Sequence, residues 1–160
     1  MKNAKPVSTP LEAHFKLSAT LFSKIDDEHN YMSRVPYFSA VESLMYAIVY
    51  FRSNLSYNVS SVRRYIENPG KEHLKAVQQI LRYLHGSADV CLQFGRNKNG
   101  VIQYVDSDFA GDHDKRRSLT GYVFTISGCA ITWEATLQTT VSLSTTEAWY
   151  LCHDPNRAWP

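Results

Sequence analysis

The sequence predicts an α+β fold: a small three-helix bundle, then an antiparallel meander of three to four strands, then one short helix. Apolar residues recur every three or four positions between residues 36 and 87, and after Gly86 the period changes to two. With 160 residues, 44% of them hydrophobic and 20% charged, the chain has a globular composition and is long enough for one domain or two small modules. We therefore expect an irregular N-terminal strap at 1–35, helices at 36–87 and the sheet with its terminal helix at 88–160.

The N-terminal strap has no regular period. It contains Pro6, Pro10 and the acidic run of residues 26–28, which favour an irregular path over the surface. Its start lacks the apolar run of a signal peptide, and no later stretch is long enough to span a membrane. The sequence therefore predicts an intracellular protein without a membrane span.

Three apolar stripes define the expected helices. The first follows Pro36, which suits the first turn of a helix, the second ends at the turn of residues 68–70, and the third ends at Gly86, in a C-cap position. Each stripe indicates core packing rather than a cofactor site. The stripes consist of Phe38, Val41, Leu44, Met45 and Ile48; of Leu55, Val59, Val62 and Ile66; and of Leu74, Val77, Ile80, Leu81 and Leu84.

The strands follow Gly86. Val90, Leu92 and Phe94 alternate with other residues, and the turn "GRNKNG" leads to a return strand at 101–106, so a hairpin is expected. "SLTGYVFTISG" and "CAITWEA" are two further strands, rich in β-branched and aromatic residues. A short helix begins near Ser144. Cysteines at 91, 129 and 152 are too scattered for a disulfide framework and indicate reduced thiols.

The stretch from Tyr104 to Ser118 combines four aspartates with a basic run, Lys115, Arg116 and Arg117. It partly imitates a calcium-binding EF-hand loop, but the fifth position is Ala110 and the twelfth, which needs a bidentate glutamate, is Arg117. A cation at that position repels calcium, so this site is excluded. The net charge of +2 does not mark the whole chain as a nucleic-acid binder, so the basic run is only a local candidate contact.

Asp106 is the best candidate metal ligand, because it ends an apolar strand and so stands on a rigid support. Asp112 and Asp114 are better explained as loop residues that partly neutralise the basic run. The plausible partner of Asp106 is Glu147, although Ser144 precedes it with the spacing of a capping box, which favours a structural role. The sequence contains no Ser-His-Asp order, no glycine-rich phosphate loop and no zinc-ligand spacing.

Several ordered motifs between Lys2 and Ala148 resemble the polyproteins of copia-type retrotransposons. "KPVSTPL", "VPYFSAVESLMYAIVY" and "NPGKEHLKAVQQILRYLHG" resemble the stretch after the reverse transcriptase palm. "YVDSDFAGDHDKRRSLTGYVFTISGCAITWEATLQTTVSLSTTEA" resembles the ribonuclease H segment that follows it. The resemblance implies an incomplete RNase H-like fold whose carboxylates hold two divalent ions, with Asp106 as the first-strand ligand and Glu147 as the first-helix ligand.

Departures from the family pattern imply that the site is vestigial. The family's next essential aspartate lies on a later strand, and the chain reaches Pro160 without it. Trp149 replaces the second glutamate of "T-E-A-E-Y", and Asp154, followed by Pro155, matches no family position. We therefore expect no functional catalytic residue, no nuclease activity, and at most a vestigial magnesium site without any other cofactor.

Arg82, Tyr83, Leu84 and His85 resemble the R-x-L-R motif of secreted effectors that oomycete plant pathogens deliver into host cells. This resemblance implies a second function, in which the chain suppresses defence or cell death by binding a host protein. The same residues flank and continue the third apolar stripe, which favours a structural role. Two hypotheses remain open: a truncated retrotransposon fragment with weak nucleic-acid affinity, and a secreted effector acting in the plant host cell.

Overall fold

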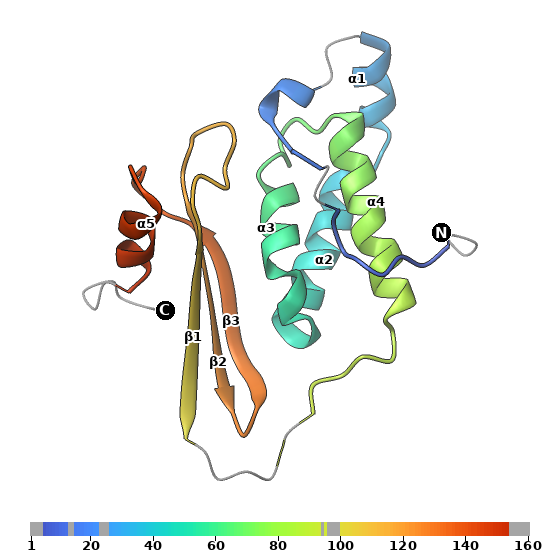
Figure 1. Cartoon of the computed structure of the whole chain (residues 1–160). Coiled ribbons are helices and arrows are strands. Elements are labelled where there is room, and N and C mark those ends of the chain that lie inside the picture. The colour runs from blue at the N-terminus through green and yellow to red at the C-terminus, as the bar shows by residue number, and fades with distance from the viewer. Residues whose placement is uncertain (1–4, 13–14, 23–25, 94, 96–99, 154–160) are drawn as a thin grey trace. The chain divides into compact units, whose positions relative to one another are not determined.

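The computed structural model describes residues 5–12, 15–22, 26–93, 95 and 100–153 (Figure 1). The chain divides into two compact units, Met1–Cys91 and Leu92–Pro160. The first is helical and the second contains a three-stranded antiparallel sheet with a helix, which confirms the α+β class.

The described residues of the first unit form four α-helices: α1 (Asp26–Ser33), α2 (Tyr37–Phe51), α3 (Ser56–Arg63) and α4 (Lys71–Gly86). Two short 3₁₀ helices accompany them, η1 (Ala19–Leu21) and η2 (Ser53–Leu55). The apolar stripes of α2, α3 and α4 meet in one mostly aliphatic core, as their spacing predicts, except that Phe38 of the first stripe is 56% exposed. At most 1% of the surface of its central residues is exposed; these are Val41, Leu44, Leu55, Val59, Val62, Ala76, Val77 and Ile80.

Helix α1 departs from the expected irregular strap. Its first turn consists of Asp26, Asp27 and Glu28, whose negative charges are stabilised by the positive end of the helix dipole. The Glu28 carboxylate also accepts a hydrogen bond from the Lys71 amide at 3.2 Å, and Met32 is buried. The acidic run therefore starts a helix, although it lacks the apolar period that would have predicted one.

The segment before α1 is held against α4 and the core. The Lys5 carbonyl accepts a hydrogen bond from Arg82 Nε at 2.7 Å, and the Leu17 carbonyl accepts one from the buried Tyr65 hydroxyl at 3.0 Å. Pro6 lies so close to Gly86 that a Cβ on this glycine would press against the proline ring. This part of the strap is therefore fastened to the helical unit by specific contacts.

Helix α4 begins with an unusual cap. Gly70 has no side chain to satisfy the first amides, and His73 instead turns back so that its Nδ1 accepts the Gly70 N–H at 2.9 Å. The imidazole is fully buried and stacks on Tyr65, with the ring centroids 4.2 Å apart. Since a main-chain N–H can only donate, Nδ1 carries no proton in this arrangement.

The second unit is a meander of β1 (Val101–Asp108), β2 (Leu119–Ile126) and β3 (Cys129–Leu137), in the order β1-β2-β3. Asp108 lies opposite Leu119 in the first pair, and Leu119 opposite Leu137 in the second. Ser127 and Gly128 join β2 to β3 with φ of 52° and 77°, the left-handed conformations that a tight hairpin turn requires.

Helix α5 (Thr145–Cys152) follows the sheet, with Ser144 as its N-cap, and packs on β1. The expected strand before the "GRNKNG" turn is absent from residues 90–93, so the first half of the predicted hairpin is wrong there; Phe94 lies outside the described residues. The partner of β1 in the sheet is β2 and not residues 90–93. Val90 and Leu92 therefore have no sheet face to pack against, and their side chains are exposed.

The three cysteines are free thiols; Cys91 is exposed, whereas Cys129 and Cys152 are buried. Across the described ranges, no helix combines the length and the apolar character needed to cross a membrane.

Candidate functional site

Asp106 stands near the end of β1, where it lies opposite Gly121 of β2. Its side chain is exposed, and its Oδ1 accepts the Ser107 N–H at 2.8 Å. The strand ladder fixes the main chain at this position, so the carboxylate projects from a rigid support.

Glu147 occupies the first turn of α5 and is also exposed. The Ser144 hydroxyl accepts the Glu147 N–H at 3.1 Å, as the capping-box spacing predicts. The Glu147 carboxylate accepts the N–H of Leu143 at 2.7 Å, so it caps the residue before Ser144 rather than Ser144 itself. This carboxylate therefore stabilises the start of α5 by accepting a main-chain hydrogen bond.

A buried glutamine joins the sheet to the helix that carries Glu147. Gln138 follows β3 and is 2% exposed. Its Nε2 donates to the Thr120 hydroxyl at 3.1 Å and to the Ala148 carbonyl at 2.8 Å, and its Oε1 accepts the Ser142 hydroxyl at 2.9 Å. One side chain thus connects β2, the loop before α5 and α5 itself.

The last turn of α5 completes this connection. The Cys152 thiol lies 3.0 Å from the Thr120 hydroxyl and 3.7 Å from the main-chain oxygen of Asp106. The strand of Asp106 and the helix of Glu147 therefore belong to one packed unit. Within the described part of the chain, however, no three His, Cys, Asp or Glu residues are grouped so that they could hold a metal ion.

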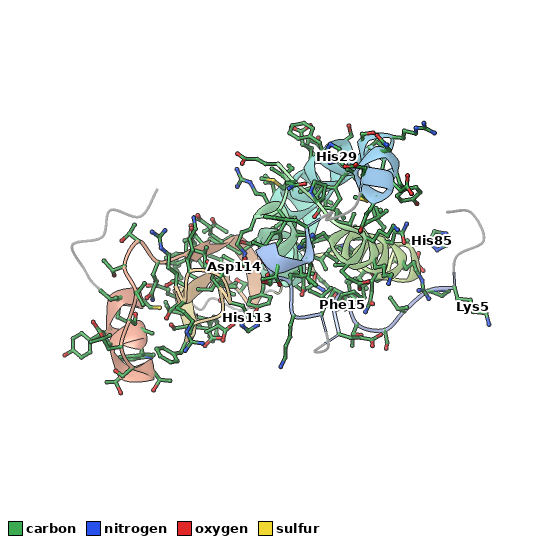
Figure 2. The ribbon with its side chains drawn as sticks, turned by 90° about the horizontal axis from the view of Figure 1, so that it is seen from above. Lys5, Phe15, His29, His85, His113 and Asp114 are labelled. Atoms are coloured by element: carbon green, nitrogen blue, oxygen red, sulfur yellow. The ribbon has the colours of Figure 1, made fainter. Side chains whose placement is uncertain are left out.

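The loop between β1 and β2 is an ordered turn around Asp112, which is 3% exposed. Its Oδ1 accepts the Asp114 N–H at 3.3 Å, its carbonyl accepts the Arg116 N–H at 2.8 Å, and its own N–H donates to the Arg117 carbonyl at 3.0 Å. Arg116 has a φ of 56°, and its side chain and that of Lys115 are exposed. Figure 2 shows Asp114 and His113 on this loop. Asp112 is thus a loop organiser.

Comparison with known proteins finds relatives of the chain as a whole. The chain is 54% identical, over 151 residues and 94% of its length, to the retrovirus-related Pol polyprotein from transposon TNT 1-94 of Nicotiana tabacum. It is 36% identical, over 94% of its length, to that from transposon RE1 of Arabidopsis thaliana. The chain belongs to the retrovirus-related Pol polyprotein family of plant transposons.

This Pol-family chain spans about a tenth of these two relatives, 11% of the first and 10% of the second. It is also 37% identical over 121 residues, 75% of its own length, to secreted RxLR effector protein 161 of Plasmopara viticola, of which it covers 85%. No model of a protein family and no solved structure matches the chain.

The R-x-L-R-like residues of this Pol-family chain form the end of α4. Arg82 holds the Lys5 carbonyl, the Tyr83 hydroxyl accepts a hydrogen bond from Asn54 at 2.7 Å, and Leu84 packs against the core. His85 is exposed, and Figure 2 shows it with Lys5 at this end of the unit. Three of the four side chains therefore have structural contacts.

Gln138 is the residue of the site that the sequence did not reveal. It stands between a strand and a helix in "LQTTVSLS", where a glutamine has no distinctive spacing. Its role depends on Thr120, Ser142 and Ala148, which meet only in the folded unit.

Proposed function

We propose that the chain is an RNase H-like part of a transposon Pol polyprotein that retains two metal ligands, Asp106 and Glu147, and does not hydrolyse RNA. The observation that carries the proposal is the placement of these two exposed carboxylates on a strand and a helix of one packed unit. A divalent ion held there would act as a Lewis acid and would generate the nucleophile from water.

Two carboxylates are too few for that chemistry. A two-metal mechanism needs ligands that clamp both ions, whereas the described residues offer no group of three. The Glu147 carboxylate also accepts the Leu143 N–H through Oε2, so its lone pairs would be shared between the start of α5 and an ion. Magnesium bound through one or two carboxylates usually keeps several waters and takes further ligands from substrate phosphates. We therefore infer weak metal binding without turnover.

The basic run would supply the contact with nucleic acid. The exposed Lys115 and Arg116 side chains offer positive charge, which attracts phosphates without reading sequence. Because so few charges take part, binding would be weak and would fall as the salt concentration rises. In this proposal the chain acts inside the cell.

An RNA–DNA hybrid cleavage assay with Mg²⁺ or Mn²⁺ tests the proposal. We expect no cleavage by the chain, and the same background with Asp106→Asn and with Glu147→Gln. Hybrid binding without metal should weaken when Lys115 and Arg116 are both changed to alanine. Cleavage that disappears with Asp106→Asn would refute the proposed inactivity.

A second candidate function rests on the Plasmopara viticola relative, of which the chain covers 85%. In this alternative the chain is secreted, enters the plant host cell and suppresses defence or cell death by binding a host protein. Expression in leaf beside a cell-death elicitor tests it, with unchanged necrosis as the refuting result. Because Arg82 fastens Lys5, folding of each Arg82 variant must be verified before a loss of effect is assigned to the motif.

A further inference from the structure

The start of helix α4 depends on a histidine that the proposed function does not use. His73 is fully buried, and its Nδ1 accepts the Gly70 N–H at 2.9 Å. Helices usually begin with a serine, threonine, asparagine or aspartate, whose side-chain oxygen accepts such an amide throughout the pH range near neutrality. Here the acceptor is an imidazole nitrogen, and histidine is the side chain whose charge ordinarily changes between pH 5 and 8. The start of α4 therefore relies on an acceptor that a proton can remove.

A segment from an earlier part of the chain packs on the same imidazole. The ring centroid of Phe22 lies 6.1 Å from that of His73, and the Tyr65 ring stacks on His73 at 4.2 Å. The Tyr65 hydroxyl in turn donates to the Leu17 carbonyl at 3.0 Å. Residues 17–22, the η1 segment, are therefore held at the start of α4 by His73 and by the ring stacked on it.

Protonation of His73 is incompatible with this arrangement. A protonated imidazole carries hydrogen on both nitrogens, so Nδ1 could no longer accept the Gly70 N–H, and two donors would face each other at 2.9 Å. The positive charge would also be buried and would lie at the positive end of the α4 dipole. The face of the Tyr65 ring would attract a cation, but it offers no acceptor for the hydrogen on Nδ1. The imidazole can therefore gain a proton only by leaving its position.

The charged groups at this end of the helical unit do not create a site for a buried cation. The η1 segment carries no charge. The Glu28 carboxylate accepts the Lys71 N–H at 3.2 Å, and Glu72 forms an ion pair with Lys75 at 2.6 Å, so both carboxylates are already engaged. The other titratable residues of α1 and of the end of α3 are exposed or partly exposed: Asp26, Asp27, His29 and Tyr31 on α1, and Arg63 and Arg64 at the end of α3.

We propose that His73 is a pH-dependent switch: the neutral imidazole holds the η1 segment against the start of α4, and mild acidification releases both. Once the ring is exposed to water, it titrates with the ordinary pKa of histidine, about 6.5. Because the closed state does not bind this proton and the open state does, the ratio of open to closed molecules should rise about tenfold between about pH 7.5 and pH 5.5. Neutral pH therefore closes this end of the helical unit, and acid opens it.

Hydrogen exchange of the whole chain tests the switch. The Gly70 and Leu74 amides both donate hydrogen bonds at the start of α4. After correction for the intrinsic pH dependence of exchange, their opening constants should rise about tenfold between about pH 7.5 and pH 5.5. In His73→Asn this rise should disappear, because the asparagine Oδ1 takes the place of Nδ1 and accepts the same N–H without titrating. The variant loses ring packing at every pH, so only the pH dependence is compared.

His85→Asn is the matched control, because His85 is exposed at the other end of the same helix. This variant should retain the tenfold rise of the unaltered chain. A rise below about twofold in the unaltered chain, or the same rise in His73→Asn, would overturn the proposal.

Nuclear magnetic resonance of the histidine rings tests the protonation step without any variant. In the folded chain the nitrogen shifts of His73 should report the Nε2–H tautomer throughout this pH range, whereas His85 should become protonated. Protonated His73 should appear only in molecules whose Gly70 amide has lost its protection from exchange. If His73 titrates together with His85 while the Gly70 amide remains protected, the closed state accepts the proton and the proposal is wrong.

Discussion

Replacing Gln138 by alanine should detach α5 from the sheet. The change removes the hydrogen bonds to Thr120, Ala148 and Ser142, each with a net contribution of about 1 kcal/mol. It also leaves a cavity in a fully packed position, which raises the expected loss of unfolding free energy to about 4 kcal/mol. Urea unfolding would measure that loss, and hydrogen exchange of the α5 amides would locate it.

Two further variants separate the contributions. Gln138→Met retains most of the volume and should lose about 3 kcal/mol, because only the hydrogen bonds are removed. Gln93→Ala is the matched control, since Gln93 is exposed in the same unit, and it should be nearly neutral. If Gln138→Ala costs less than about 1 kcal/mol, or if α5 retains its protection from exchange, the role assigned to Gln138 is wrong.

Three other predictions follow from local geometry. Gly70→Ala should destabilise the helical unit by about 2 kcal/mol or more, measured as a lower unfolding midpoint, because the added Cβ would overlap the main-chain oxygen of Leu21. Ser144→Ala should cost about 1 kcal/mol and increase exchange in the first turn of α5, since the helix loses its cap; unchanged exchange would contradict this. Burial and the Glu134 carboxylate raise the pKa of Tyr122 from 10.0 to about 12, so the folded state favours the neutral phenol. Stability should therefore fall as the pH rises from 10 towards 12, and ultraviolet titration should show this tyrosine ionising late; a Tyr122→Phe chain with the same pH profile would refute that assignment.

Much of the fold was predictable because its signals are local. The stripes of α2, α3 and α4 follow the helical period, and the turn at Ser127 and Gly128 separates two strands rich in β-branched residues. Helix α1 was not predictable from period, because its acidic first turn and one buried methionine stabilise it. The alternation at Val90 and Leu92 predicted a strand that residues 90–93 do not form, because pairing depends on a distant partner.

In the candidate site, too, local spacing predicted some contacts and missed others. The spacing of Ser144 and Glu147 predicted the start of α5. It did not predict that the Glu147 carboxylate accepts the Leu143 N–H, because that hydrogen bond depends on the rotamer of the glutamate. The contribution of Gln138 arises from contacts with residues between 4 and 18 positions away, brought together by the hairpin and the loop before α5. Polar networks of this kind have no periodic signature in a sequence.

The composition of the two interiors determines how each unit tolerates random substitution. The core of the helical unit consists mostly of aliphatic side chains, which can replace one another when their volumes are similar, although this unit also buries Arg52, Ser61, His73 and Gln79. The sheet unit buries Ser118, Thr120, Gln138 and Ser142, whose donors and acceptors must each point in one direction. In a transposon-derived sequence that drifts without selection, the docking of α5 on the sheet should decay before the helical bundle does.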